Sequence, residues 1–330
     1  MNQDCIQRIV SASGVAAGEL VLIHLWGEAE DLPIAQDFLC AMAALGASPV
    51  LLQQSRSRNR AIFEQAQAPC FGAAYFERLS HFDTVLDLFA CQPIVLGSTL
   101  PEPQMALYRS YISGLFSALM QAKRFLQLRL PTAANAAQSG LEDYIPRLEA
   151  AYDTDYAALL ERCLQAKANL EGHDRLVLRT GAHCALQFDL TDRRWLVDAG
   201  DGDWPCGEIY IAPLEARTEG SVFFPKLFVE DVGCFSDVTL TVTGGHITDS
   251  NDPELTAFFR NQPPENTVVC ELGLGMNPGV RDLCGCTVLD EKMAGTFHIA
   301  VGANRMFGGQ NDARIHTDLV GTGPFTLDNN

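Results

Sequence analysis

Two histidines and an aspartate near the C-terminal end of the chain have the residue types and the spacing of metal ligands. His298 lies in "GTFHIAVG", and His316 and Asp318 lie in "RIHTDLV". If both segments are strands, their side chains alternate between two faces, so His316 and Asp318 share one face, about 7 Å apart. An H-x-D pair on one strand face is a compact unit for binding Zn, Mn, Co or Fe.

The same alternation leaves room around His298. Phe297, Ile299 and Val301 point to one face of the predicted strand, toward a core. His298 points to the other face, between small side chains. A ligand therefore has space beside the imidazole.

Two glutamates add carboxylates to this set. Glu208 ends a loop in "DWPCGEIYIAP", and Glu271 follows apolar residues in "NTVVCELGLGMNP". A buried carboxylate is costly unless it pairs with a cation or binds a metal, and an arginine partner for each glutamate is the alternative. With His298 and the H-x-D pair, these glutamates supply enough ligands for two divalent ions. A bridging hydroxide would make that cluster neutral and would act as a nucleophile at neutral pH.

The segment between the two histidine strands is rich in glycine and asparagine. Gly308 and Gly309 allow the chain to turn closely past the site. Asn304 and Asn311 could orient ligands or substrate, or they could serve only as turn residues. Both interpretations stay open at the level of the sequence.

Composition limits the classes of function. The chain has 330 residues and is 47% apolar, which favours two domains with a substantial core. A net charge of −18 argues against nucleic acid, because phosphate binding needs clustered Lys and Arg. The 11 cysteines lack CxxC spacing and are typical of reduced thiols. The N-terminus has no signal-peptide pattern, and the early apolar run "LVLIHLW" is too short to span a bilayer, so we predict a cytoplasmic protein.

The elements that must position the site fall into two groups. In the first, "GELVLIHLWGE", "LPIAQDFLCAMAALGA" and "SPVLLQQ" read as strand, helix and strand, which predicts a parallel sheet. "HFDTVLDLFA" is expected to add a strand, and His24 is expected to be an ordinary sheet histidine. Residues 101–171 are predicted to be mostly helical, with one helical stripe from Glu102 to Leu128.

The second group is rich in short β segments. From "RLVLRTG" to "NTVVCELGLG", alternating or β-rich runs are separated by Gly, Pro, Asp and Asn, which indicates antiparallel strands. "TVTGGHITD" is predicted to form a hairpin. The fold class is therefore α/β, with an α/β domain over residues 1–170 and a β-rich, metal-binding catalytic domain over residues 171–330.

The chain resembles the M29 family of metallo-aminopeptidases, a family also described as thermophilic metalloproteases or leucyl aminopeptidase-like enzymes. It resembles especially the shorter, less characterised members of that family. The resemblance runs from about residue 100 to the end and follows the family's order. It is carried by "LPTAANAAQSGLEDY", "WPCGEIYIAPLEARTEGSVFF", "ELGLGMNPGV", "LDEKMAGTFHIAVG" and "FGGQNDARIHTDL". It implies a two-domain, usually dimeric hydrolase that removes N-terminal amino acids from peptides or small amides at a dinuclear site of Zn, Co or Mn.

The resemblance also implies roles for particular residues. By their positions in the P-x-G-E, E-L-G-x-G, H-I-A-x-G and H-x-D motifs, the metal ligands would be Glu208, Glu271, His298, His316 and Asp318. The acidic pair Asp290-Glu291 precedes the histidine strand, and Glu291 is a candidate ligand or general base.

One position departs from the family pattern. Better known members have a tyrosine seven residues after the strand histidine, and here that residue is Arg305. We predict that Arg305 or a backbone N–H of the glycine loop stabilises an oxyanion, or that its guanidinium binds a substrate carboxylate. A solvent-exposed loop arginine is the alternative.

Two other functions are compatible with the same residues. His298, His316 and Asp318 have the composition of a mononuclear Fe(II) site, and the fold resembles that of dihydroxypyridine ring-cleaving dioxygenases. Those dioxygenases lack glutamates at the positions of Glu208 and Glu271. A non-catalytic binding protein is the third possibility. The expected partners are a peptide or small amide and a second copy of the chain, with neither nucleic acid nor membrane.

Overall fold

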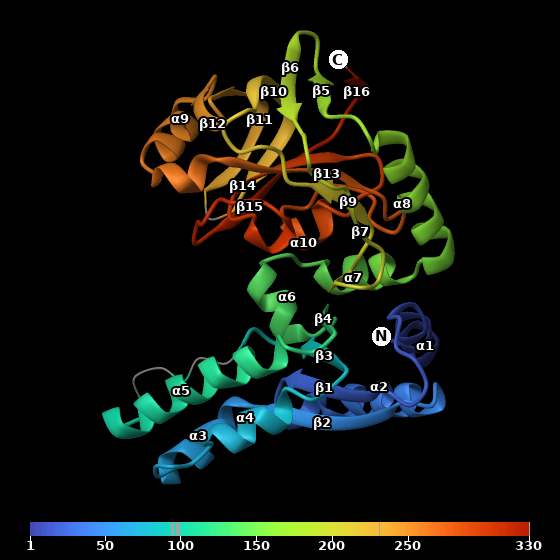
Figure 1. Ribbon diagram of the computed structural model, residues 1–330, viewed down its shortest axis with the longest axis vertical. Coiled ribbons are helices and arrows are strands. Elements are labelled where there is room, and N and C mark those ends of the chain that lie inside the picture. Colours follow the sequence, from blue (N-terminus) through green and yellow to red (C-terminus); the bar gives the residue numbers. More distant parts are fainter. Residues whose placement is uncertain (94–95, 97–99, 231, 330) are drawn as a thin grey trace. The chain divides into compact units, whose positions relative to one another are not determined.

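The computed structural model describes residues 1–93, 96, 100–230 and 232–329, which form two compact units (Figure 1). Unit 1 consists of Met1–Tyr156 and Gly200–Pro205, and unit 2 consists of Ala157–Ala199 and Cys206–Asn330. These bounds differ from the predicted boundary between residues 170 and 171. That prediction rested on where the helical pattern ends, whereas the last helix of the run belongs to unit 2.

Unit 1 is built on a parallel sheet with strand order β2-β1-β3-β4-β8 in the described part of the chain. Its strands are β1 (Leu20–Trp26), β2 (Ser48–Gln54), β3 (Thr84–Phe89), β4 (Arg124–Arg129) and β8 (Asp203–Trp204). Helix α2 (Leu32–Ala44) connects β1 to β2, so the predicted strand-helix-strand unit is confirmed. The expected strand in "HFDTVLDLFA" is also confirmed, as β3.

The helices of unit 1 begin and end as α1 (Gln3–Ala12), α3 (Arg56–Gln65), α4 (Ala73–Leu79), α5 (Glu102–Leu119), α6 (Ala133–Ser139) and α7 (Tyr144–Tyr152). The predicted helical stripe through Leu128 is wrong beyond Leu119. There the chain turns and enters β4, in which Leu126 and Leu128 are buried on the sheet. The alternating burial in this short segment is typical of a strand, although the spacing of its apolar residues also continues the helical pattern.

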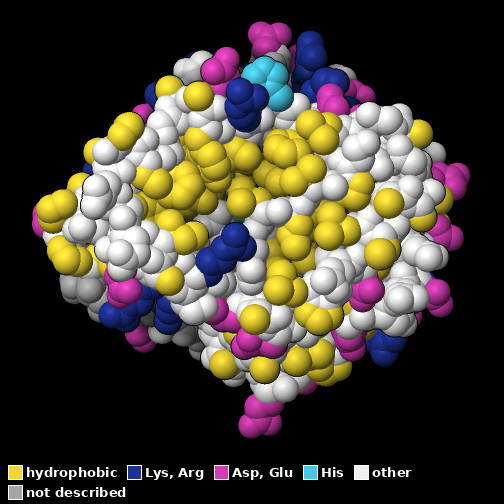
Figure 2. Space-filling model, turned by 90° about the horizontal axis from the view of Figure 1, so that it is seen from below, with side chains coloured by type: hydrophobic (Ala, Val, Ile, Leu, Met, Phe, Trp, Pro, Cys, Tyr) yellow, Lys and Arg dark blue, Asp and Glu magenta, His cyan; other side chains and the backbone are white. Residues whose placement is uncertain are grey.

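Strand β2 forms an edge of this sheet. Its Val50 side chain is exposed, as are Leu20 on β1 and Ile62 on α3. Figure 2 views the molecule from the side on which β2, α3 and α4 lie in Figure 1, and hydrophobic side chains gather over a broad area there. Pro49 lies within the edge strand, where a missing N–H reduces pairing with other chains.

Unit 2 contains two antiparallel sheets in its described residues, with orders β12-β11-β10-β6-β5-β16 and β15-β14-β13-β9-β7. The first comprises β5 (Arg175–Thr180), β6 (Cys184–Asp189), β10 (Glu219–Val229), β11 (Gly233–Thr243), β12 (His246–Ser250) and β16 (Phe325–Asn329). The second comprises β7 (Leu196–Asp198), β9 (Glu208–Ile211), β13 (Val269–Gly275), β14 (Phe297–Gly302) and β15 (His316–Gly321). Strands β11 and β12 form the predicted hairpin with its Gly-Gly turn.

Helices of unit 2 are α8 (Tyr156–Leu170), α9 (Pro253–Arg260) and the short α10 (Thr287–Asp290), with single turns η2 (Pro264–Thr267) and η3 (Arg305–Phe307). In the described part of the chain, no helix is both long and apolar enough to cross a membrane.

The core between the two sheets of unit 2 fixes the orientation of β14. The ring of Phe297 lies 5.5 Å from that of Phe224 on β10 and 5.3 Å from that of Phe325 on β16. Ile299, on the same face of β14, is fully buried. The apolar face of β14 is therefore the predicted one, and His298 points to the opposite side of its sheet.

Candidate metal centre

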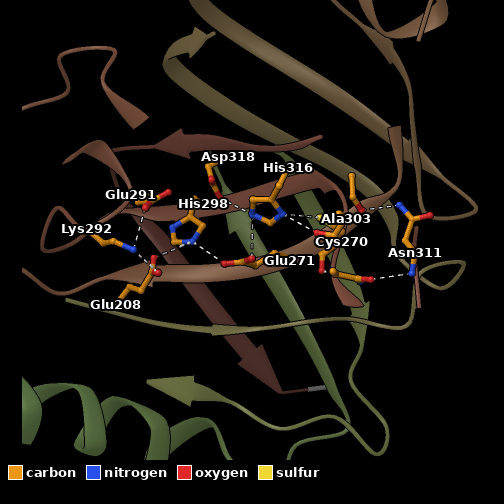
Figure 3. A network of polar contacts seen from close by, with 12 residues as sticks. Glu208, Cys270, Glu271, Glu291, Lys292, His298, Ala303, Asn311, His316 and Asp318 are labelled. Carbon is orange, nitrogen blue, oxygen red and sulfur yellow. Dashed lines mark hydrogen bonds and ion pairs between the residues drawn. The ribbon is translucent and has the colours of Figure 1, made fainter. Parts of the chain in front are cut away.

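The predicted ligands lie on one face of the sheet β15-β14-β13-β9-β7 (Figure 3). They are carried by β9 (Glu208), β13 (Glu271), β14 (His298) and β15 (His316 and Asp318). Across the sheet, Glu271 pairs with Ala300, and Ala300 pairs with Asp318. Because Ala300 has only a methyl group, the two carboxylates can approach each other above it.

These five side chains form two triads that share one carboxylate. The ligand atoms of Glu208, Glu271 and His298 lie within 4.8 Å of one another, and so do those of Glu271, His316 and Asp318. Oε1 of Glu271 is 3.3 Å from Nε2 of His298, while Oε2 is 3.4 Å from Nε2 of His316. The two oxygens of Glu271 therefore face different triads.

Glycines in the glutamate motifs make room for this arrangement. A Cβ on Gly273 would lie 1.9 Å from Nε2 of His298. Gly207, which precedes the first glutamate, has φ +124°, and its Cβ would lie 2.8 Å from Cβ of Asn277. Asn277 in turn donates through Nδ2 to the carbonyl of Cys206 at 2.8 Å. Residues with a side chain at the two glycine positions would displace a ligand or the strand that carries it.

A backbone carbonyl orients His316. Nδ1 of the ring lies 2.8 Å from the carbonyl oxygen of Ala303, so Nδ1–H donates there. In the neutral ring Nε2 is then the nitrogen with the free electron pair, and it points toward Glu271 and Asp318, which lie 3.4 and 3.6 Å away. A hydrogen bond of this kind holds the imidazole of metal-binding histidines in the required tautomer.

Lys292 is a residue of the site that the sequence interpretation missed. Its buried ammonium lies 2.5 Å from Oε1 of Glu208 and 2.9 Å from Oε1 of Glu291 (Figure 3). It also lies 3.5 Å from Oδ2 of Asp198. The available signal was its place in the motif "LDEKMAG", directly after the acidic pair. Lys292 holds one oxygen of Glu208, while Oε2 of Glu208 is buried without a hydrogen-bond donor in the described structure.

The carboxyl and imidazole groups of this cluster shift each other's pKa values. Burial opposes the ionisation of Glu271, but hydrogen bonds with His298 and His316 outweigh it and lower the pKa of its carboxyl. Burial also disfavours the charged imidazoles, yet contacts with carboxylates raise the pKa of His298 to about 9 and raise the pKa of His316 as well. Burial raises the pKa of Glu208 and of Glu291. Binding of a cation would therefore displace protons from the side chains that hold it.

The other two predicted site residues have contrasting positions. Glu291 is buried beside the cluster, in contact with Lys292. Arg305 is exposed on η3 and pairs with Asp312, 3.1 Å away, and no contact with a predicted ligand is recorded for it among the described residues. Asp290, which neighbours Glu291, accepts two backbone N–H groups of the preceding loop. The catalytic roles of Glu291 and Arg305 stay predictions.

Two aromatic residues near the cluster were also missed. Tyr210 follows Glu208 by two residues and so shares its strand face, a signal that the sequence contained. Phe307 comes from the glycine-rich loop, and its ring lies 5.7 Å from the ring of His316. No pattern in the sequence predicts that contact.

The donors fit divalent metal ions. Each triad offers two carboxylates and one imidazole, a set that suits Zn, Mn, Co and Fe(II). Among the described residues, Oε2 of Glu208 accepts no hydrogen bond and lies 3.5 Å from Nε2 of His298, so it is available to a cation held between Glu208, Glu271 and His298.

Comparisons with known proteins support the fold. No family model and no curated protein matches the chain. Among solved structures, 2,5-dihydroxypyridine dioxygenase from Pseudomonas putida KT2440 is similar with a TM-score of 0.69 and 16% identity, over 99% of this chain and 93% of that one. AmpT from Thermus thermophilus, an aminopeptidase, is similar with a TM-score of 0.66 and 17% identity, over 99% and 95%.

Both of these similar proteins are enzymes. The mixed α/β fold, which has a parallel N-terminal sheet and antiparallel C-terminal sheets, is therefore a fold that occurs in enzymes. At such low identities the similarity establishes the fold alone. The reaction has to be argued from the site.

Proposed function

We propose that this chain is a metal-dependent aminopeptidase of the M29 type, which hydrolyses an N-terminal amino acid from a peptide or small amide at a dinuclear centre. The observation that carries the proposal is the position of Glu271, whose two carboxylate oxygens face separate triads. A carboxylate shared in this way is the arrangement expected for two neighbouring ions. A single ion would need only one of the triads.

The chain's own residues divide the work of such a reaction. Bound divalent ions would supply Lewis acidity and a nucleophile from water at neutral pH. Lys292 holds Glu208 by one oxygen, and the Ala303 carbonyl holds His316, so both ligands are oriented in advance. Glu291 is a buried carboxyl with a raised pKa beside the cluster, which suits it to accept a proton from the attacking water and return it to the leaving amine.

The charges support two ions rather than one. Asp198, Glu208, Glu271, Glu291 and Asp318 are the carboxyl groups of the cluster, and Lys292 is its ammonium. With all five ionised, the carboxylates carry five negative charges and the ammonium of Lys292 carries one positive charge. Two divalent cations then bring the sum to zero, which lowers the cost of placing the cluster in a buried site and leaves Glu291 able to accept a proton.

A second candidate is a mononuclear Fe(II) dioxygenase. It is favoured by the 2-His-1-carboxylate composition of His298, His316 and Asp318 and by the similarity to 2,5-dihydroxypyridine dioxygenase. Glu208 and Glu271 point into the same cluster, which favours the hydrolase. A mononuclear site made of the two histidines and Asp318 would leave those two buried carboxylates without a role.

Metal stoichiometry separates the two candidates. We would load the full chain with Zn²⁺, Co²⁺, Mn²⁺ or Fe²⁺, measure metal per chain by elemental analysis, and assay leucine-p-nitroanilide and dipeptides in parallel with oxygen uptake on 2,5-dihydroxypyridine. Two ions per chain and cleavage that a chelator abolishes are expected. One iron per chain with oxygen-dependent ring cleavage would replace the proposal by the second candidate. No metal at all would favour a non-catalytic binding protein.

Arg305 and the oligomeric state belong to the same proposal. If Arg305 stabilises an oxyanion, Arg305→Ala lowers kcat on both substrate types; if it binds a substrate carboxylate, only the KM for dipeptides rises. Unchanged kinetics would agree with its exposed pairing with Asp312. The family resemblance also implies a homodimer, which light scattering of the purified chain would test.

A further inference from the structure

The loop of residues 303–311, here called the glycine loop, is anchored to the sheet that carries the metal centre. Asn304 is fully buried, and its Nδ2 donates to the carbonyl of Cys270 and to Oε1 of Glu215, both at 3.1 Å. Its Oδ1 accepts the backbone N–H of Asn311 at 2.9 Å. One side chain thus joins the two ends of the loop to the residue that precedes Glu271.

A second set of contacts holds the middle of the loop. Glu215 accepts the backbone N–H of Gln310 at 2.5 Å, and its other oxygen pairs with Arg193 at 3.0 Å. Arg193 also donates to the carbonyl oxygen of Gly308. A Cβ on Gly309 would lie about 2 Å from the Asn304 side chain, so the backbone packs directly on that amide. These contacts favour one conformation of the glycine loop.

That conformation places Phe307 over the face of the metal centre. The ring of Phe307 lies 5.5 Å from that of Tyr210 at 82°, and 5.7 Å from that of His316 at 89°. Tyr210 is on β9 and His316 is on β15, and β13 and β14 lie between those strands. Phe307 therefore covers the part of the sheet that carries Glu271 and His298.

Core packing does not account for these rings. Phe307 and Tyr210 are only partly buried, and the residue before Phe307, Met306, is among the most exposed side chains of the chain. A partly exposed aromatic pair next to polar ligands is suited to contact a bound molecule.

We propose that Tyr210 and Phe307 form an aromatic wall that binds a planar or large apolar group of the substrate next to the metal centre. For an aminopeptidase this group is the side chain of the N-terminal residue, and for a ring-cleaving enzyme it is the ring itself. Edge-to-face contact with two rings favours such groups over small or charged ones. The inference rests on the proposed metal centre, because the metal fixes the reacting end of the substrate.

Hydroxamates of two amino acids are suitable probes, because the hydroxamate group binds the metal ions and leaves the side chain free to contact the protein. We would titrate the zinc-loaded full chain with L-phenylalanine hydroxamate and with L-alanine hydroxamate by calorimetry. We expect the phenylalanine probe to bind at least about tenfold more tightly, the scale on which an apolar pocket discriminates. Equal affinities would overturn the aromatic wall.

Variants test which rings are responsible. In Phe307→Ala the preference should fall to within about threefold, while Tyr210→Phe, which keeps the ring, should retain it. Met306→Ala is the matched control, since it removes an exposed side chain from the same turn, and it should bind both probes like the unmodified chain. A preference that survives in Phe307→Ala, or that falls equally in Met306→Ala, would contradict the proposal.

Two further readouts separate this inference from the proposed function. Zinc content and thermal melting of Phe307→Ala should match those of the unmodified chain, which shows that the loop truncation leaves the ligands in place. A phenylalanine preference without any amide cleavage would reject the hydrolase and keep the wall. An unmodified chain that holds no metal would reject both.

Discussion

Glu271 is the residue on which both triads depend. We expect Glu271→Gln, which keeps the shape of the side chain but removes its charge, to lower the metal content from two ions per chain to one or none, because an amide offers a single, weaker oxygen ligand. Elemental analysis and calorimetric titration with Zn²⁺ measure this. Glu265→Gln, at an exposed position before β13, is the control and should bind two ions. Full occupancy in Glu271→Gln would mean that the triads are independent.

Proton release gives a second test at the level of the residue. Burial opposes protonation of His298, but its hydrogen bond with Glu271 and the charge of Glu208 raise its pKa to about 9. Below that pH the imidazole carries a proton that must leave before the nitrogen binds a cation. The contribution of His298 to metal affinity should therefore rise with pH up to about 9 and then level off, while His316, whose pKa is also raised, adds a separate dependence.

Titrations at pH 7 in buffers with different ionisation enthalpies count the protons released. We expect at least one proton per chain, and we expect fewer near pH 10, where the ring is already neutral. A heat of binding that does not depend on the buffer would contradict the assignment of His298 as a ligand.

At the scale of the element, the strands that carry the ligands could be predicted because period-two alternation specifies which side chains share a face. His298, Glu208 and the H-x-D pair all follow from that rule. Lys292 could not be found in the same way, because it lies in no strand and its partners are distant in sequence. The contact of Phe307 with His316 depends on the path of a loop, which no periodicity encodes.

Within β13, Gly273 packs directly against the ring of His298. We expect Gly273→Ala to abolish metal binding at the His298 triad, because the added methyl would lie 1.9 Å from Nε2 of His298 and the ring must turn away. Metal content and the absorption of the Co²⁺-loaded protein report the change. Gly72→Ala, whose Cβ would meet its nearest atom at an ordinary 3.5 Å, is the control and should behave like the unmodified chain. Two bound ions in Gly273→Ala would show that β13 can shift to accept the methyl.

At the scale of the whole molecule, the predicted metal ligands belong to unit 2, and unit 1 has a buried polar pair of its own. Nδ1 of His24 on β1 lies 2.8 Å from Oδ1 of Asp87 on β3, and both side chains are fully buried. The expectation of an ordinary sheet histidine therefore fits its place in β1, although its acidic partner could not be predicted. Register between parallel strands is set by tertiary packing, which a single sequence does not display.

Removing one partner of this pair should destabilise unit 1 without affecting the metal. We expect His24→Leu to lower the free energy of unfolding by about 3 kcal/mol or more, because it leaves Asp87 buried without its hydrogen bond. The double variant with Asp87→Leu should recover much of this loss. Denaturation followed by fluorescence suits the measurement, because the ring of Trp26 lies 5.0 Å from that of His24. Loss of zinc from folded His24→Leu would contradict the expectation that this pair does not affect the metal centre.

The return of Gly200–Pro205 to unit 1 has a consequence for the order in which the chain can fold during synthesis. Trp204 of β8 is fully buried, and its carbonyl accepts the hydroxyl of Tyr152 at 3.1 Å. When Tyr156 leaves the ribosome, unit 1 still lacks β8, which follows only after the first strands of unit 2 have emerged. Truncation at the helical boundary would therefore leave one fragment without this edge strand and would separate Trp204 in the other fragment from its partners in unit 1, so neither fragment would hold a complete unit.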